Sequence, residues 1–135
     1  EDIRRIENMT PQEKWEYFED LLSTCIRCYA CRNACPLCYC PTCFVDESQP
    51  QWVGKSQDPT DIRTFHFLRA YHCAGRCTDC GACERACPMG IKVRILTKKL
   101  EKDCLELFDW ESGLTLEKRP PLDTYRPDDP DDFIK

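Results

Sequence analysis

Residues 25–36 read CIRCYACRNACP, and residues 77–88 read CTDCGACERACP. The two stretches place their cysteines and their closing proline at the same positions, offset by 52 residues. Each follows the pattern Cys-x2-Cys-x2-Cys-x3-Cys-Pro, so the chain carries one motif as an internal repeat. Because eight of the thirteen cysteines belong to this repeat, the chemistry of the motif decides how the surrounding chain folds.

The cysteines must serve either as disulfides or as metal ligands, because thirteen in 135 residues is far above ordinary usage. Cysteines separated by two or three residues rarely meet disulfide geometry with one another, and their total here is odd. The same spacing suits a shared metal centre. The sequence contains no signal-peptide pattern, so we expect a reducing, cytoplasmic environment.

The motif spacing points to cubane iron–sulfur clusters. A [4Fe–4S] cubane has four iron corners, and each corner takes one cysteine thiolate. Two-residue gaps let three sulfurs of a tight loop converge on three corners, whereas the fourth corner must be reached from elsewhere. In runs with this spacing the fourth cysteine ligates the other cluster of the pair. We therefore expect two clusters with these ligands: Cys25, Cys28, Cys31 and Cys87 for cluster one, and Cys77, Cys80, Cys83 and Cys35 for cluster two.

Zinc is the main alternative metal. Tetrahedral zinc sites usually take two pairs of cysteines and lack the third and fourth positions seen in both copies here. A zinc-stapled interaction module is therefore the less favoured interpretation.

Five further cysteines lie outside the repeat. Cys38, Cys40 and Cys43 are dense enough to suggest a third metal site, with Cys73 as a fourth ligand. The alternative is that these thiols are buried as small hydrophobic side chains. For Cys104, on the apolar face of an expected helix, core packing is the favoured role.

Several charged and aromatic residues stand in or next to the motifs. The arginines Arg27, Arg32, Arg76 and Arg85 either raise the potential of a nearby cluster or pair with surface acids. His66 and His72 are six positions apart on an expected helix, which is not the usual spacing for two ligands on one face. We expect packing or surface roles for both histidines.

Three helices are expected around the motifs. Residues 9–23 begin with a capping box from Thr10 to Glu13 and carry an apolar face that includes Trp15. A second helix runs from the cap Asp58 to about residue 72, with Ile62, Phe65, Leu68 and Arg69 at helical spacing. A third covers residues 95–108, with Leu96, Leu100, Cys104 and Leu107 along one face.

The predicted fold class is α+β. Its centre is a two-cluster ferredoxin-like core in residues 25–95, with residues 91–95 as a short strand or extended turn. An irregular loop over residues 44–57 and the second helix form an insert between the motifs. The flanking parts are an N-terminal docking helix in residues 1–24, a C-terminal helix in residues 96–110, and an extended acidic, proline-rich tail in residues 111–135.

The two runs resemble bacterial two-cluster ferredoxins over about residues 25–95. The longer context is CIRCYACRNACPLCYCPTCF at residues 25–44 and FHFLRAYHCAGRCTDCGACERACPMGI at residues 65–91. It resembles the dicluster domain of anaerobic electron-transfer subunits that accompany formate dehydrogenases, deazaflavin-linked hydrogenases and heterodisulfide-reductase-type complexes. The resemblance implies a non-catalytic relay of single electrons between a flavin or metal centre and another redox partner.

The alternative is a free-standing soluble ferredoxin. Against it stand the 41 residues between Cys35 and Cys77, the five extra cysteines and the long tail. We expect the partners to be other subunits of a redox complex. A net charge of −5 does not favour nucleic acid as a partner. The sequence contains no run of 18 apolar residues, so it predicts no membrane-spanning helix. No phosphate loop or dinucleotide fingerprint is present, so a flavin or nicotinamide site would belong to another chain.

Overall fold

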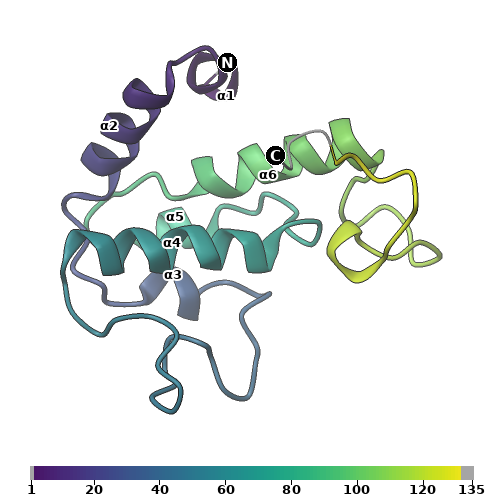
Figure 1. The fold of residues 1–135 in the computed structure, drawn as a ribbon. Helices are drawn as coiled ribbons and strands as arrows, with labels where there is room; N and C mark the ends of the chain where they lie inside the picture. The colour runs from purple at the N-terminus through teal and green to yellow at the C-terminus, as the bar shows by residue number, and fades with distance from the viewer. Residues whose placement is uncertain (1, 132–135) are drawn as a thin grey trace.

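The computed structural model describes residues 2–131, and in them every regular element is a helix (Figure 1). The elements are α1 (Asp2–Glu7), α2 (Pro11–Leu22), α3 (Ala30–Asn33), α4 (Pro59–Cys73), α5 (Ala82–Arg85), α6 (Arg94–Phe108) and the 3-10 turn η1 (Pro121–Asp123). None of these helices is both long and apolar enough to cross a bilayer.

The α+β expectation is not confirmed, because the described residues contain no strand. Residues 91–93 form a turn that leads directly into α6. The backbone N–H of Val93 donates to the carbonyl of Ile91 at 2.8 Å, and both side chains are buried. The local hydrogen bond and the apolar contacts satisfy this segment without a neighbouring strand.

The helices α2 and α4 begin where the sequence predicts. The Thr10 hydroxyl accepts from the Glu13 N–H at 3.3 Å, and the Glu13 carboxylate accepts from the Thr10 N–H at 2.7 Å. This reciprocal pair satisfies two backbone donors that the first turn leaves free. At α4 the Asp58 carboxylate accepts from the Thr60 N–H at 2.8 Å, and Pro59 occupies the first helical position.

Helix α4 is the central element of the fold. It contacts both α2 and α6, and Figure 1 shows it running across the middle of the molecule beside the short motif helices α3 and α5. Phe65 on α4 is 1% exposed and packs in one cluster with Val45, Val53 and the motif cysteines Cys31 and Cys83. The core therefore consists of a helix packed directly on the two cysteine loops.

Three side chains expected on apolar helix faces are only partly covered. Trp15, Leu68 and Leu107 are 53%, 39% and 48% exposed. Trp15 is covered on one side by the guanidinium of Arg63, 4.6 Å from the ring centroid. On α4 the buried positions instead include the polar side chains of His66 and Arg69, because that helix faces the motifs as well as its neighbouring helices.

Helix α1 and the segment just after α6 both contact the central helices. Helix α1, which the sequence analysis did not predict, packs on α6, where Glu7 pairs with Lys99 at 3.0 Å and also with Lys102. After α6 the Trp110 Nε1–H donates to the carbonyl of Gly75 at 2.7 Å. The expected tail of residues 111–135 is irregular apart from η1 up to residue 131, and its last four residues lie outside the described part.

Candidate metal centres

The internal repeat is reproduced in the backbone. Arg27 and Tyr29 have φ of 55° and 60°, and their counterparts 52 positions later, Asp79 and Gly81, have φ of 56° and 73°. A one-turn helix follows each pair, with N–H groups donating to the carbonyls of Tyr29 and Gly81 at 2.9 and 3.1 Å. Two left-handed residues in each loop therefore turn the three leading cysteines of a motif toward one point.

Four motif thiols line one narrow cavity between the two loops. They come from Cys25, Cys28, Cys31 and Cys87. The first three belong to the first motif, and the fourth arrives from the second motif just after α5. The structure thus brings together the four cysteines that the sequence analysis grouped as cluster one.

A second narrow cavity has the complementary lining. Its motif thiols are those of Cys77, Cys80, Cys83 and Cys35, and Cys73 at the end of α4 lies beside them. The two sets also match in burial, position by position: the second cysteine of each motif is exposed, the third is buried, and the first and fourth are half-buried. The two cavities therefore have equivalent cysteine linings, and in each cavity the fourth cysteine comes from the other motif.

The thiol arrangement fits clusters better than single ions. Among the described residues, the one cysteine trio whose sulfurs all lie within 4.8 Å of one another is Cys35, Cys38 and Cys73. A tetrahedral zinc ion with bonds of about 2.3 Å would draw its four sulfurs closer than that. No three thiols of either motif set gather this closely, which suits ligands of separate iron corners.

Backbone amides point at the motif sulfurs. The N–H of the left-handed Arg27 donates to the Cys25 sulfur at 3.3 Å. In the second loop burial and a hydrogen bond with Glu101 raise the pKa of Cys77 to about 12, whereas the hydrogen bond from the Asp79 N–H to its sulfur lowers the pKa. Amide donors favour a negatively charged sulfur, so these two hydrogen bonds offset part of the cost of burying a thiolate in each loop.

His66 adds a side-chain hydrogen bond that sequence reasoning missed. Its Nε2 lies 3.2 Å from the Cys25 sulfur, and the ring is 3% exposed. Burial lowers the pKa of His66 to about 4, and the positive charges of Arg69 and Arg27 act in the same direction. The ring is therefore neutral, and with a thiolate as acceptor Nε2 carries the proton and donates it. His72, by contrast, is exposed and packs edge-on against Phe44.

Arg69 is a buried cation between the two thiol sets. It is 4% exposed, its Nη2 donates to the Cys31 carbonyl at 3.0 Å, and its Nε has no hydrogen-bond partner in the described chain. Burial lowers the pKa of this guanidinium, whereas Cys31, Cys73, Cys38 and Cys35 raise it, with a net rise. The neighbouring groups that raise its pKa most are thus cysteine sulfurs. Helical spacing placed Arg69 on the inner face of α4, but it gave no reason to assign it a role at the clusters.

The arginines near the motifs mostly have local partners. Arg32 pairs with Asp46 at 3.0 Å, which agrees with the surface-acid alternative. Arg27 is buried and donates to the Ser56 carbonyl at 2.7 Å, while Arg85 donates to the Cys80 carbonyl at 2.8 Å. Arg76 donates to a carbonyl at the end of α4. Three of these four side chains therefore fix the loops themselves rather than pair with acids.

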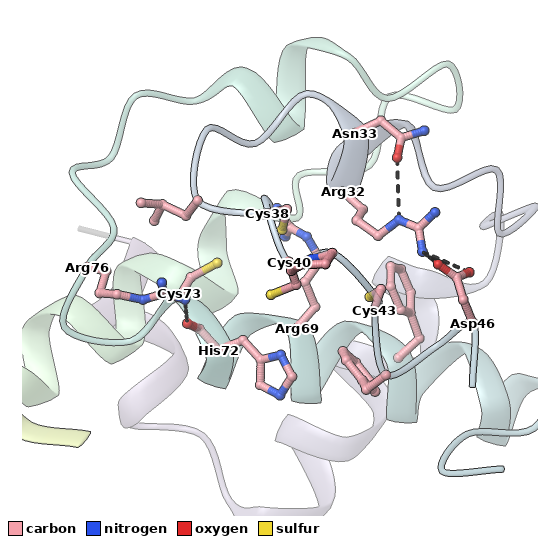
Figure 2. A pocket seen from close by; sticks show the side chains of 14 residues that line it. Arg32, Asn33, Cys38, Cys40, Cys43, Asp46, Arg69, His72, Cys73 and Arg76 are labelled. Atoms are coloured by element: carbon pink, nitrogen blue, oxygen red, sulfur yellow. Dashed lines mark hydrogen bonds and ion pairs between the residues drawn. The ribbon is translucent and has the colours of Figure 1, made fainter. Parts of the chain in front are cut away.

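The remaining cysteines separate into two groups. Cys104 is buried with Ala74 and Trp110 in a small apolar cluster. The other four, Cys38, Cys40, Cys43 and Cys73, line a larger cavity of about 450 Å³ (Figure 2). A hydrogen bond from the Cys73 thiol lowers the pKa of Cys38 to about 5, and the same contact raises the pKa of Cys73.

Comparison with known proteins places this geometry in a family. The 4Fe-4S dicluster domain matches residues 21–91. The chain is 32% identical over 110 residues to the F420-dependent formate dehydrogenase subunit beta of Methanocaldococcus jannaschii, a match that covers 82% of this chain and 27% of that protein. It is 31% identical over 98 residues to F420-dependent formate dehydrogenase 1 subunit beta of Methanococcus maripaludis, with 73% and 24% covered.

The chain spans about a quarter of the length of these curated relatives. The match of the family covers both motifs and the helix between them, which confirms the resemblance drawn from the cysteine spacing. The cofactors of such a domain are two [4Fe–4S] clusters, and the two thiol sets supply four ligands for each. The chain therefore belongs to the 4Fe-4S dicluster domain family.

Proposed function

We propose that this chain is a non-catalytic relay that passes single electrons through two [4Fe–4S] clusters within a larger oxidoreductase. The observation that carries the proposal is the pair of adjacent cavities, each lined by four motif thiols, with Arg69 buried between them. Bound in these sites, each cluster takes up and releases one electron at a time.

The ligand sets that we propose are the exchanged ones. Cys87 completes the first set and Cys35 completes the second, because each lines the cavity of the opposite motif. This exchange ties the loops to each other and holds the two sites next to each other. Adjacent sites suit a relay, since electron transfer depends on a short, fixed separation.

The protein contributes electrostatics rather than acid–base chemistry. Charge, hydrogen bonds to sulfur and burial are the means by which a protein sets the potential of an iron–sulfur site. Here these are the buried Arg69 cation, the amides of Arg27 and Asp79, and the ring N–H of His66. The exposed second cysteine of each set, Cys28 or Cys80, brings each site to the surface, where electrons can enter and leave.

We further propose that the relay works beside a formate-oxidising or F420-reactive unit located in another subunit or domain. The support is the identity of the two relatives, each of which is a beta subunit of an F420-dependent formate dehydrogenase. Residues 1–24 and the tail after residue 110 would serve as docking segments, since Leu114, Leu116 and Tyr125 are exposed. A cytoplasmic setting fits the thirteen cysteines, none of which forms a disulfide.

The test is metal and spectroscopic analysis of the anaerobically purified chain. We expect iron and acid-labile sulfide, and an electron paramagnetic resonance spectrum of the dithionite-reduced chain that shows two magnetically interacting cubanes. A colourless chain that contains zinc and no sulfide would refute the relay. A chain that purifies with both clusters but runs alone, and exchanges electrons with unrelated carriers, would instead favour a free ferredoxin.

A further inference from the structure

We propose that Cys38, Cys40, Cys43 and Cys73 hold a third [4Fe–4S] cluster, next to cluster two. This site goes beyond the dicluster relay, which needs only the eight motif cysteines. The proposal rests on where the four thiols lie, on the charges around them and on their position relative to Cys35.

The four thiols converge from two separate segments. Cys38, Cys40 and Cys43 lie on the loop that leaves the first motif, and Cys73 is the last residue of α4. All four line the same cavity of about 450 Å³. Figure 2 shows Cys38, Cys40 and Cys73 around a common space, with Cys43 on the side of Arg32. Four cysteine ligands are the complement that a cubane requires.

The lining of this cavity is cationic. Arg32, Arg69 and Arg76 all contribute to it, and its one carboxylate among the described residues, Asp46, is paired with Arg32 at 3.0 Å. Arg69, which also lines the cavity of the second motif set, is 4% exposed, and its Nε has no hydrogen-bond partner among the described residues. A buried cation with an unsatisfied donor needs an anionic neighbour. A cluster held by four thiolates supplies that negative charge and accepts hydrogen bonds through its sulfurs.

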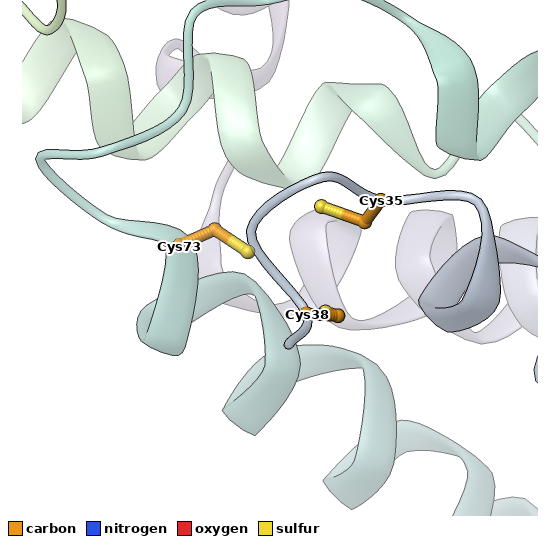
Figure 3. A group of neighbouring side chains, drawn as sticks. All are labelled: Cys35, Cys38 and Cys73. Carbon is orange, nitrogen blue, oxygen red and sulfur yellow. The ribbon is translucent and has the colours of Figure 1, made fainter. Parts of the chain in front are cut away.

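The separate positions of Cys40 and Cys43 favour a cluster over one ion. Cys38 and Cys73 have their sulfurs within 4.8 Å of each other and of Cys35, whereas Cys40 and Cys43 do not belong to this group (Figure 3). A single zinc ion would need all four sulfurs at about 2.3 Å from one point. Thiols distributed around a cavity of this size suit the separate corners of a cubane.

The third site would lie at the end of the relay. The Cys35 sulfur, which we assign to cluster two, is within 4.8 Å of both Cys38 and Cys73. Cys40, which is not part of this trio, is exposed. The order of centres is therefore cluster one, cluster two and the third cluster, with the last reaching the surface.

The experiment compares the intact chain with the double variant Cys40→Ser/Cys43→Ser. Neither of these residues lines the two motif cavities, so the variant removes ligands of the third site alone. After anaerobic purification and reconstitution with iron and sulfide, we expect about twelve irons per chain and a loss of about a third of the iron and sulfide in the variant. The spectrum of the two interacting motif clusters should persist.

Cys104→Ser is the matched control, because Cys104 is buried in a cluster of apolar contacts away from this cavity, and it should keep all the iron. Circular dichroism reports whether the variants keep their helices. The proposal is overturned if the intact chain holds only the iron of two cubanes, if the double variant keeps its full iron content, or if the double variant loses one zinc ion instead. The first of these results would leave the two-cluster relay intact.

Discussion

At the scale of single residues, His66 contacts a proposed cluster ligand directly. Its ring N–H reaches the Cys25 sulfur at 3.2 Å. Such a bond stabilises the reduced state more than the oxidised one, because the sulfur is more negative after reduction. We expect His66→Phe, which keeps an aromatic ring and removes the donor, to lower the potential of cluster one. If the bond differs by about 1 kcal/mol between redox states, the shift is roughly 40 mV.

A redox titration followed by electron paramagnetic resonance measures this shift. His72→Phe serves as the control, since His72 makes no contact with a motif thiol in the described structure and should leave cluster one unchanged. An unchanged potential in His66→Phe would show that the imidazole only fills space.

Cys87→Ser tests the exchange of ligands. Cys87 belongs to the second motif by sequence, but its side chain lines the cavity of the first. We expect this variant to damage cluster one more than cluster two, with loss of one of the two interacting signals and of up to about half of the motif-bound iron. Cys104→Ser should leave both signals intact. Loss of cluster two alone in Cys87→Ser would mean that each motif supplies all four of its own ligands.

At the scale of elements, the left-handed residue before each one-turn helix controls the shape of its loop. Gly81 has φ of 73°, and a Cβ there would lie 3.0 Å from the Arg85 Nη1. A left-handed conformation costs an ordinary L residue roughly 1–2 kcal/mol. We therefore expect Gly81→Ala to strain the second loop and make cluster two bleach faster in air or with chelator, while cluster one decays at its original rate.

The visible absorbance of the iron–sulfur charge-transfer band, followed against time together with the paramagnetic signals, separates the two decays. The matched variant is Gly90→Ala, at a glycine of φ 66° that follows Cys87, where a Cβ meets no atom within 4 Å. This variant carries a similar backbone cost outside the loop. Equal bleaching of both clusters in Gly81→Ala would show that its strain is not local.

The elements also show what sequence patterns can and cannot predict here. The caps at Thr10 and Asp58 are local signals, and both helices begin where those signals stand. The position of Cys35 and Cys87 beside the opposite motif was predicted from the chemistry of the motif. In contrast, the burial of Arg69 and the His66–Cys25 contact depend on how α4 packs against the loops. Periodicity assigns a residue to a helix face, but it does not predict that the surface packed against that face is lined by cysteine side chains.

The same limit explains why the α+β fold class was not confirmed. The short apolar run at residues 91–95 has a composition that suits either a strand or a turn. These residues form a strand only if a partner strand is available to pair with them. The described chain provides only helices and cysteine loops around them. The fold class therefore rested on the resemblance to ferredoxins and not on the pattern of these residues.

At the scale of the whole molecule, the metal centres form part of the core. The largest apolar cluster includes Cys31 and Cys83, with Cys25, Cys43 and Cys87 packed against it, and the fully buried Phe65 rests on the same loops. A domain of this size buries a limited apolar area, and metal-binding free energy then becomes folding free energy. We expect removal of iron with a chelator at mildly acidic pH to unfold the motif loops and to loosen α4 against them.

Far-ultraviolet circular dichroism and limited proteolysis of the chelated chain measure this loss. Helix α2 has its own complete capping box, but twelve residues are too few for a stable isolated helix in water, so most of the helical signal should disappear with the iron. Cleavage should begin within residues 25–57, where the loops are no longer bound to a cluster. A chelated chain that retains its helical spectrum and resists protease would show that the apolar contacts alone hold α4, α6 and the loops together.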